Sequence, residues 1–201
     1  MAGTSDQPRR LVVGISASSA PQYGIALLEA LAANSDVESH LILSRSAHRT
    51  IELETDLTAT DVEELADIVH DPVDFAASVS SGSFLTAGMV VAPCSMGTLA
   101  AIAHGLTPSL IARAAGVTLK ERRRLVLVPR ETPLSLIHLR NMVTVTEAGA
   151  TVLPPVPGFY SAPQSINDLI SHTVGKVLDQ FGIDHDLFRR WTTPGEEQTD
   201  E

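Results

Sequence analysis

The sequence predicts a doubly wound α/β fold, Rossmann-like or flavodoxin-like, in which helices cover both faces of a parallel sheet. Two short apolar runs, LVVGI at 11–15 and LVLV at 125–128, are continuous and do not alternate with polar residues, as in strands that are buried on both faces. Segments with helical spacing of apolar residues separate such runs. Aromatic residues are 4% of the chain and hydrophobic residues 44%, which suits a helix-covered sheet better than an aromatic-rich β-sandwich.

Predicted strands and helices alternate along the chain. We expect strands at 11–15, 39–43, 89–92 and 125–128, with a further extended segment at 151–153. We expect helices at 25–33, 47–53, 61–69, 97–104, 136–148 and 166–181. Thr60 or Asp61 would cap the third helix, and the SVSSGS segment at 78–83 is typical of a loop. Ligands of such folds bind beyond the carboxyl ends of the strands, so the residues that follow each strand are the candidates for function.

Length and composition exclude several classes of protein. The 201 residues fit one domain, which we place at 10–191, between a flexible N-terminus at 1–9 and an acidic tail at 192–201. The formal net charge of −10 argues against general binding to nucleic acids or anionic membranes. No apolar run approaches the roughly 20 residues of a membrane span, and the start MAGTSDQPRR does not resemble a signal peptide. Because Cys94 is the single cysteine, nothing demands an oxidising compartment, and we expect a cytoplasmic protein.

Half of the 14 basic residues lie between positions 113 and 140. Seven basic side chains there outnumber two acidic ones, which leaves a charge of +5 (7 − 2). The basic residues are Arg113, Lys120, Arg122, Arg123, Arg124, Arg130 and Arg140. One interpretation is a solvated basic surface. The other is a pocket for an anionic small molecule such as a phosphate, because guanidinium groups bind phosphate oxygens in a bidentate fork.

Small hydroxylated residues follow the first three predicted strands. The run from Ser16 to Ser19 could bring backbone N–H groups and hydroxyls to a phosphate at a helix N-terminus, although it lacks the G-x-G-x-x-G dinucleotide pattern. Ser44 follows the second strand, where capping of the next helix is its simplest role. Ser95 and Thr98 follow the third strand at the start of a helix.

The fourth strand ends in a charged pair. Arg130 and Glu131 lie between two prolines, where Arg130 could bind an anion and Glu131 could exchange a proton; a surface ion pair is the alternative. The seven histidines show no metal-ligand spacing, and Cys94 fits a small core residue better than a nucleophile. These residues predict an α/β enzyme that uses an anionic, phosphorylated cofactor or substrate.

Three segments resemble the flavin prenyltransferases, the UbiX type, which were formerly described as small subunits of hydroxyarylic acid decarboxylases. The segments are PCSMGTLAAIAHG at 93–105, LIARAAGVTLKERRRLVLVPRETPLSLIHLRNM at 110–142 and GATVLPPVPGFY at 149–160. The resemblance implies a metal-independent transfer of a dimethylallyl group from dimethylallyl phosphate to N5 and C6 of reduced FMN. The product, prenylated FMN, would serve a partner UbiD-type decarboxylase. The resemblance also implies a homododecamer built of trimers.

The resemblance implies a role for each of sixteen residues. Glu131 would protonate the departing phosphate, and Glu54 would lie near the flavin, so that Glu131, Glu54, Lys120 and Arg130 form the catalytic set. The residues that would hold FMN are Ala17, Ser18, Ser19, Ser44, Ser95, Met96, Gly97, Thr98 and Arg130. The residues that would bind the prenyl donor are Tyr160, Lys176, Lys120, Arg113 and Trp191.

This chain departs from the family pattern at several positions. The turn that is commonly S-G-A-S-G reads Ser16-Ala17-Ser18-Ser19-Ala20, so that alanines replace two glycines and restrict φ near the flavin phosphate. Ser109 stands where the family has an asparagine, and Arg45 stands where it has a lysine. Lys176 stands where some members have an arginine, so the positive charge is kept but the bidentate fork of the guanidinium is lost.

Two alternatives accompany this interpretation. A cysteine-type flavoprotein decarboxylase shares the fold class, but its expected P-x-M-N-x-x-M motif is absent from the sequence. A non-catalytic FMN carrier or decarboxylase accessory protein is favoured by the altered turn at Ala17 and Ala20. The carrier would bind FMN without prenyl transfer.

Overall fold

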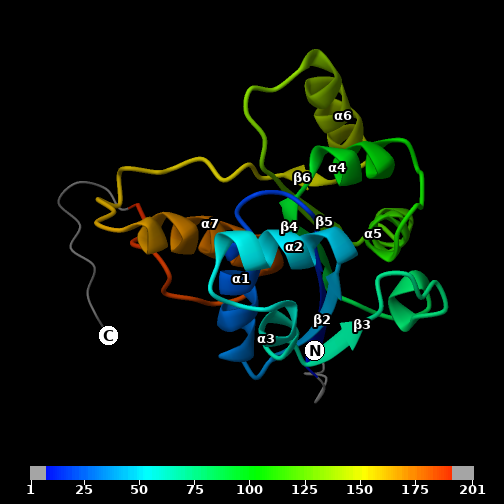
Figure 1. Ribbon diagram of the computed structural model, residues 1–201, viewed down its shortest axis with the longest axis horizontal. Coiled ribbons are helices and arrows are strands. Elements are labelled where there is room, and N and C mark those ends of the chain that lie inside the picture. The colour runs from blue at the N-terminus through cyan, green and yellow to red at the C-terminus, as the bar shows by residue number, and fades with distance from the viewer. Residues whose placement is uncertain (1–7, 192–201) are drawn as a thin grey trace, which may run out of the picture.

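The computed structural model describes residues 8–191, and its centre is a six-stranded, all-parallel sheet (Figure 1). The strand order is β3-β2-β1-β4-β5-β6. The strands are β1 (Arg9–Ile15), β2 (Val37–Leu43), β3 (Ile68–His70), β4 (Gly88–Cys94), β5 (Arg124–Pro129) and β6 (Thr151–Val152). Every described pair of neighbouring strands is parallel, which confirms the predicted fold class.

Helices cover both faces of the sheet and give it two apolar cores. The helices are α1 (Gln22–Ala32), α2 (Arg45–Glu54), α3 (Ala59–Glu63), α4 (Met96–Ala103), α5 (Leu110–Lys120), α6 (Leu136–Glu147) and α7 (Ile166–Phe181), with a 3-10 turn η1 at Ser78–Ser80. One core is formed with α1, α2, α3 and α7, and the other with α4, α5 and α6. In the described part of the chain, no helix is both long and apolar enough to cross a membrane.

The segment predicted as one helix over 61–69 is a short helix followed by an edge strand. The helix α3 begins after Thr58, which forms a capping box with Asp61, and it ends at Glu63. Ile68 and Val69 pair instead with His40 and Leu41 of β2. Pairing with a neighbouring strand therefore overrides the helical spacing, and the prediction was wrong there. The helix α5 was not among the predicted elements.

The strand order reverses at the boundary between β1 and β4, where ligands of doubly wound folds bind. Gly24 of α1 packs closely against β4 at this boundary, because a Cβ at Gly24 would lie 2.3 Å from the carbonyl oxygen of Ala92. The glycine lets the start of α1 approach the sheet. The turn before α1 and the start of α4 therefore meet at the carboxyl edge of the sheet.

Candidate functional site

The turn after β1 joins the carboxyl ends of three strands. Ser16 is buried, donates from Oγ to the carbonyl oxygen of Pro93 over 3.0 Å, and accepts from the backbone N–H of Ser95 over 2.7 Å. Ser18 donates from Oγ to the carbonyl oxygen of Arg130 over 3.0 Å. The ends of β1, β4 and β5 are thus held together by two serine hydroxyls. The Ser18 hydroxyl is engaged with protein, so this turn faces a ligand chiefly with its backbone.

Glu54, the last residue of α2, holds the second half of the same turn. Its Oε2 accepts from the Ser19 hydroxyl over 3.1 Å and from the backbone N–H of Ala20 over 2.7 Å. Its carbonyl oxygen accepts from Nε2 of Gln22 over 2.8 Å. Ala20 has a φ of +72°, in the region that favours glycine, whereas Ala17 is not among the described residues with positive φ. Glu54 therefore fixes a turn that carries backbone strain at one residue.

Two helices begin at this edge with serine caps. Ser44 caps α2 by accepting from the N–H of Ala47 over 3.2 Å, as its position after a strand suggested. Ser95 caps α4 by accepting from the N–H of Thr98 over 3.2 Å, and it donates to the Thr98 hydroxyl over 3.0 Å. Met96 is buried, whereas Gly97 is exposed and a Cβ there would meet only Ser95 Oγ, at 4.0 Å. The first turn of α4 is open toward solvent, as an anion at a helix N-terminus requires.

Arg130 and Glu131 lie at the same edge, directly after β5. Both side chains are exposed, and the Arg130 guanidinium makes no hydrogen bond or ion pair to other residues in the range 8–191. The N–H of Thr132 donates to Oε1 of Glu131 over 3.0 Å, and Oε2 of this exposed side chain has no hydrogen-bond partner among residues 8–191. A cation and a carboxyl group are therefore presented together beside the start of α4.

Cys94 lies in this region but is unsuited to nucleophilic chemistry. Its side chain is fully buried, and burial raises the pKa of the thiol to about 12. A neutral thiol is a weak nucleophile at neutral pH. The interpretation of Cys94 as a core residue agrees with this environment.

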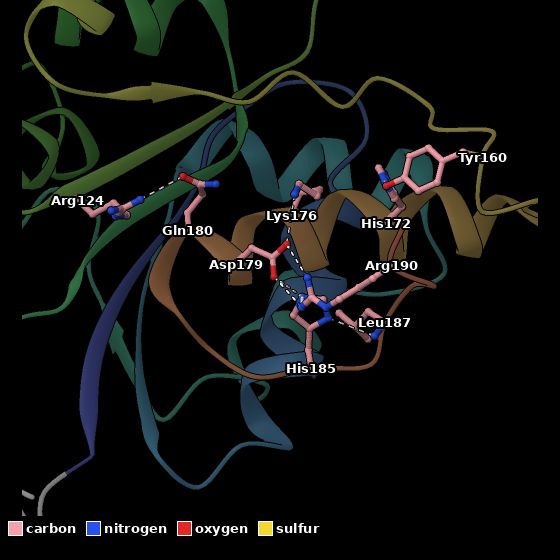
Figure 2. A network of polar contacts seen from close by, with 9 residues as sticks. All are labelled: Arg124, Tyr160, His172, Lys176, Asp179, Gln180, His185, Leu187 and Arg190. Carbon is pink, nitrogen blue, oxygen red and sulfur yellow. Dashed lines mark hydrogen bonds and ion pairs between the residues drawn. The ribbon is translucent and has the colours of Figure 1, made fainter. Parts of the chain in front are cut away.

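Tyr160, Lys176 and Trp191 form a second group around α7 (Figure 2 shows Tyr160 and Lys176). The Tyr160 hydroxyl lies 2.9 Å from Nε2 of His172, and the ring centroids of Tyr160 and Trp191 are 5.8 Å apart. Lys176 Nζ donates to Oδ2 of Asp179 over 3.3 Å. Burial, followed by the Lys176 charge, lowers the pKa of His172, so this ring is neutral at pH 7.

Lys120 and Arg113 lie away from both groups. Lys120 is the last residue of α5, pairs with Glu121, and approaches Gly82 near the amino end of β5. Arg113 donates to the carbonyl oxygen of Ser80 over 3.2 Å. Because Lys120 precedes β5 and Arg130 follows it, a six-residue strand separates the backbones of the two residues by about 20 Å.

Two further arginines of the basic segment also have structural partners. Arg123 donates to the carbonyl oxygens of Gly82 and Phe84, over 2.6 and 2.7 Å. Arg124 donates to the side chain of Gln180 over 3.1 Å. The cluster at 113–140 is therefore not one phosphate pocket within a single chain, because its members are distributed over both edges of the sheet.

Sequence reasoning gave no role to three residues that organise the site. Tyr23, at the start of α1, has a pKa raised by burial, while the nearby Thr173 side chain of α7 and the Arg130 charge act in the opposite direction. Tyr23 thus lies between the carboxyl edge and α7. His172 orients Tyr160, and Asp179 holds Lys176. His172 and Asp179 lie four residues before and three residues after Lys176, on the same side of α7, and this helical spacing is the signal that could have identified them.

Comparisons with known proteins identify the family of this chain. A family model described as Flavoprotein matches residues 2–178. The chain is 54% identical over 185 residues to the flavin prenyltransferase UbiX of Escherichia coli (strain K12), which covers 91% of this chain and 98% of that relative.

Two solved structures are similar over nearly the whole chain. The crystal structure of AnUbiX (PadA1) in complex with FMN and dimethylallyl pyrophosphate has a TM-score of 0.91 and 53% identity, covering 93% of this chain and 99% of that one. The crystal structure of a dodecameric FMN-dependent UbiX-like decarboxylase from Escherichia coli O157:H7 has a TM-score of 0.90 and 51% identity, covering 92% and 100%. The peptidyl-cysteine decarboxylase EpiD, with a TM-score of 0.63 and 15% identity, covers 87% and 99% and shares the fold alone.

Proposed function

Because this chain belongs to the Flavoprotein family and, within it, to the UbiX-type flavin prenyltransferases, we propose that it transfers a dimethylallyl group from dimethylallyl phosphate to reduced FMN. The C–O bond of the donor breaks, C1 of the prenyl group bonds to N5 of the flavin as N5 loses its proton, and inorganic phosphate leaves. In the ring closure the prenyl double bond takes up a proton, its C3 carbon bonds to C6, and C6 gives up its hydrogen as a proton. The crystallised relative AnUbiX holds dimethylallyl pyrophosphate, so the donor is a mono- or diphosphate of the same prenyl group.

The exposed pair Arg130 and Glu131 carries this proposal. Breaking an allylic C–O bond places negative charge on the phosphate and positive character on the prenyl group. The Arg130 guanidinium has no competing protein partner among residues 8–191 and is available to the phosphate. Oε2 of the exposed Glu131 side chain is free of protein partners among residues 8–191 and can give the leaving phosphate its proton. A protonated phosphate is a good leaving group, so the step needs no divalent ion.

The carboxyl edge fits FMN at the boundary of β1 and β4. The open first turn of α4, at Met96 and Gly97, suits the flavin phosphate, since its N–H groups point outward and Gly97 leaves space. The turn from Ala17 to Ser19 borders the same space and is kept in position by Glu54 and Ser18. Bound FMN supplies the nucleophilic N5 and C6 atoms; the protein positions the donor and moves the proton.

We infer that the donor phosphate is held by residues from more than one copy of the chain. Lys120 cannot reach Arg130 across the length of β5, and Tyr160, Lys176 and Trp191 project from a separate surface around α7. The helix α6 exposes a row of large apolar side chains, as an interface between copies would require: Leu136, Ile137, Leu139 and Val143. The similar dodecameric structure supports such an assembly, built of trimers, in which one copy contributes Lys120 or Tyr160 to the Arg130 of another.

The product would serve a UbiD-type decarboxylase as its cofactor, and we place both proteins in the cytoplasm. Such a role needs no stable complex, because prenylated FMN can be released and rebound. The second candidate function is that of a flavin carrier, which would bind FMN at the same site without prenyl transfer. The alanine at position 20, where the family commonly has glycine, favours this candidate.

An anaerobic incubation with reduced FMN and dimethylallyl phosphate, followed by mass analysis of the flavin, distinguishes the prenyltransferase from the flavin carrier. We expect a flavin that carries one additional C5 prenyl unit. The Glu131→Gln variant should lose at least about 100-fold in rate while it retains FMN, because it keeps the shape but not the acid. A parallel incubation with the diphosphate identifies the preferred donor.

Glu64→Gln, which changes an exposed carboxyl group at the end of α3, is the matched control and should turn over like the unmodified protein. Unmodified FMN that remains bound under all conditions would instead establish the carrier. Full activity of Glu131→Gln would remove Glu131 from the acid role.

A further inference from the structure

Asp179 is the centre of a cation cluster that joins α7 to the segment that follows it (Figure 2). Arg190 donates from Nη2 to Oδ1 over 2.8 Å and from Nη1 to Oδ2 over 3.2 Å, a bidentate fork. His185 Nε2 lies 3.2 Å from Oδ1, and Lys176 Nζ donates to Oδ2 over 3.3 Å. The hydrogen bond from Arg190 is the main reason that the pKa of Asp179 falls to about 2, so this carboxylate is charged at any physiological pH.

The chain reverses its direction after α7, and the cluster holds the returning segment. Gly182 ends α7 in the left-handed conformation, at a φ of +59°, and the residues after it run back along the helix (Figure 1). The His185 side chain is nearly fully buried and accepts at Nδ1 from the N–H of Leu187 over 3.2 Å. Nδ1 is thus the acceptor, so Nε2 carries the proton that points to Asp179. His185 and Arg190 therefore fasten both ends of this returning segment to one carboxylate.

Aromatic contacts extend the cluster to the predicted donor-binding residues. Phe188 packs against His172 with ring centroids 4.8 Å apart, and the Arg190 guanidinium lies 5.4 Å from the Phe188 ring. Trp191 comes next in the chain and meets Tyr160 edge-on, although 70% of its surface is exposed. With so little burial of its own, Trp191 depends on its neighbour Arg190 for its position.

We propose that Asp179 is a positioning residue for the prenyl-donor site: it clamps Arg190, so that Trp191 stays against Tyr160, and it keeps Lys176 beside them until a phosphate takes that ammonium group. This proposal rests on the proposed function. Lys176 is the member of the cluster that can leave, because it makes one contact of 3.3 Å where Arg190 makes two. When Lys176 turns to the phosphate, Arg190 and His185 still satisfy Asp179, so no buried charge is left unpaired.

The single tryptophan of the chain makes the clamp directly measurable. Trp191 is the only residue of its kind, so time-resolved anisotropy of tryptophan fluorescence in the flavin-free protein reports on this side chain alone. We expect Arg190→Gln and Asp179→Asn each to enlarge the fast, sub-nanosecond component. Arg190→Lys, which keeps the charge and loses the fork, should fall between them and the unmodified protein.

Steady-state kinetics supply the second readout. Arg190→Gln should raise KM for the prenyl phosphate about 10-fold, while kcat and the Kd for FMN stay within about twofold, because the clamp positions donor-binding residues and touches neither the flavin nor the proton donor. Gln180→Ala is the matched control: it lies next to Asp179 on α7, but its partner is Arg124 at the sheet, and neither readout should change.

Unchanged Trp191 anisotropy in both clamp variants would overturn the proposal, and so would an equal rise of KM in Gln180→Ala. The anisotropy requires no turnover. If the protein proved to be a flavin carrier, the proposed function would fail while the clamp itself would still be confirmed or refuted.

Discussion

Ala20 introduces backbone strain into the turn that borders the proposed flavin-phosphate site. Its φ of +72° is accessible to glycine at no cost, but an L-residue with a Cβ pays about 1 kcal/mol or more for it. The turn accepts this strain because Glu54 fixes the Ala20 N–H and Ser18 fixes the chain two residues earlier. The strained residue borders the proposed flavin-phosphate site, so relief of the strain should affect stability and binding together.

We expect Ala20→Gly to stabilise the protein. The strain removed exceeds the entropy that glycine adds to the unfolded chain, so the net gain is about 0.5–1 kcal/mol, or a rise in Tm of roughly 2 °C for a chain of this size. Differential scanning calorimetry measures the rise, and titration with FMN should show equal or tighter binding.

Ala17→Gly is the matched control, since Ala17 does not have a positive φ and the added glycine only increases the entropy of the unfolded chain. Its Tm should fall slightly. If both variants shift Tm in the same direction, strain at Ala20 is not the cause.

Residue by residue, the sequence predicted the edge of the sheet better than the surface around α7. Ser16, Ser95 and Arg130 come together because the carboxyl ends of parallel strands meet at one edge, which follows from the order of elements alone. The contact between Tyr160 and His172 depends on the path of the long connection before α7, and no local pattern specifies that path.

At the scale of elements, the edge strand β3 introduces a titratable cluster beneath the loop that follows it. Nδ1 of His40 on β2 lies 3.0 Å from Nε2 of His70 on β3, and Nε2 of His40 lies 2.8 Å from Oε1 of Glu38. Phe84 packs edge-on against the His40 ring. Burial lowers the pKa of His70, and the His40 charge adds to this, while Asp74 acts in the opposite direction. The hydrogen bond from His40 is the main cause of the lowered pKa of Glu38, to which Arg10 also donates.

This cluster should make the protein less stable in mild acid. His70 has a lower pKa in the folded than in the unfolded chain. The stability of the folded state therefore does not depend on His70 protonation above the unfolded value near 6.5, and it decreases as the pH falls below that value, because the unfolded chain binds the proton first. His70→Gln removes the titration, and we expect a smaller drop in Tm between pH 7.5 and 5.5 than in the unmodified protein. His48→Gln, on α2 outside the cluster, should show the full drop; an equal drop in His70→Gln would contradict this assignment.

The sequence predicted those elements whose signal is local. Continuous apolar runs identified β1, β4 and β5, which are buried on both faces. The strand β3 has three residues, with Ile68 and Val69 partly exposed at the sheet edge, and it exists because β2 offers free backbone groups. An edge strand of this length leaves too short a pattern to distinguish it from the end of a helix.

At the scale of the whole molecule, the fold separates residues that one reaction requires. Arg130 and Glu131 follow the carboxyl end of β5, whereas Lys120 precedes its amino end. No rotation of side chains spans that strand, since even long side chains reach about 6–7 Å and the gap is about 20 Å. A shared site between copies reconciles this geometry with the proposed reaction, and the exposed apolar row on α6 gives the copies a surface on which to meet.

A shared site predicts that two inactive variants restore activity when they assemble together. Lys120→Ala and Glu131→Gln should each lose prenyl transfer, but a mixed oligomer pairs an intact Glu131 with a neighbour's intact Lys120 at about one quarter of its sites when the variants mix randomly in equal amounts. Co-expression with two different affinity tags, followed by tandem purification and the flavin mass assay, measures the recovery. Arg130→Ala mixed with Glu131→Gln is the control: these neighbours lie on one loop and serve the same site, so that pair should stay inactive. If the Lys120 mixture also stays inactive, then Lys120 acts within its own chain or has no part in the reaction.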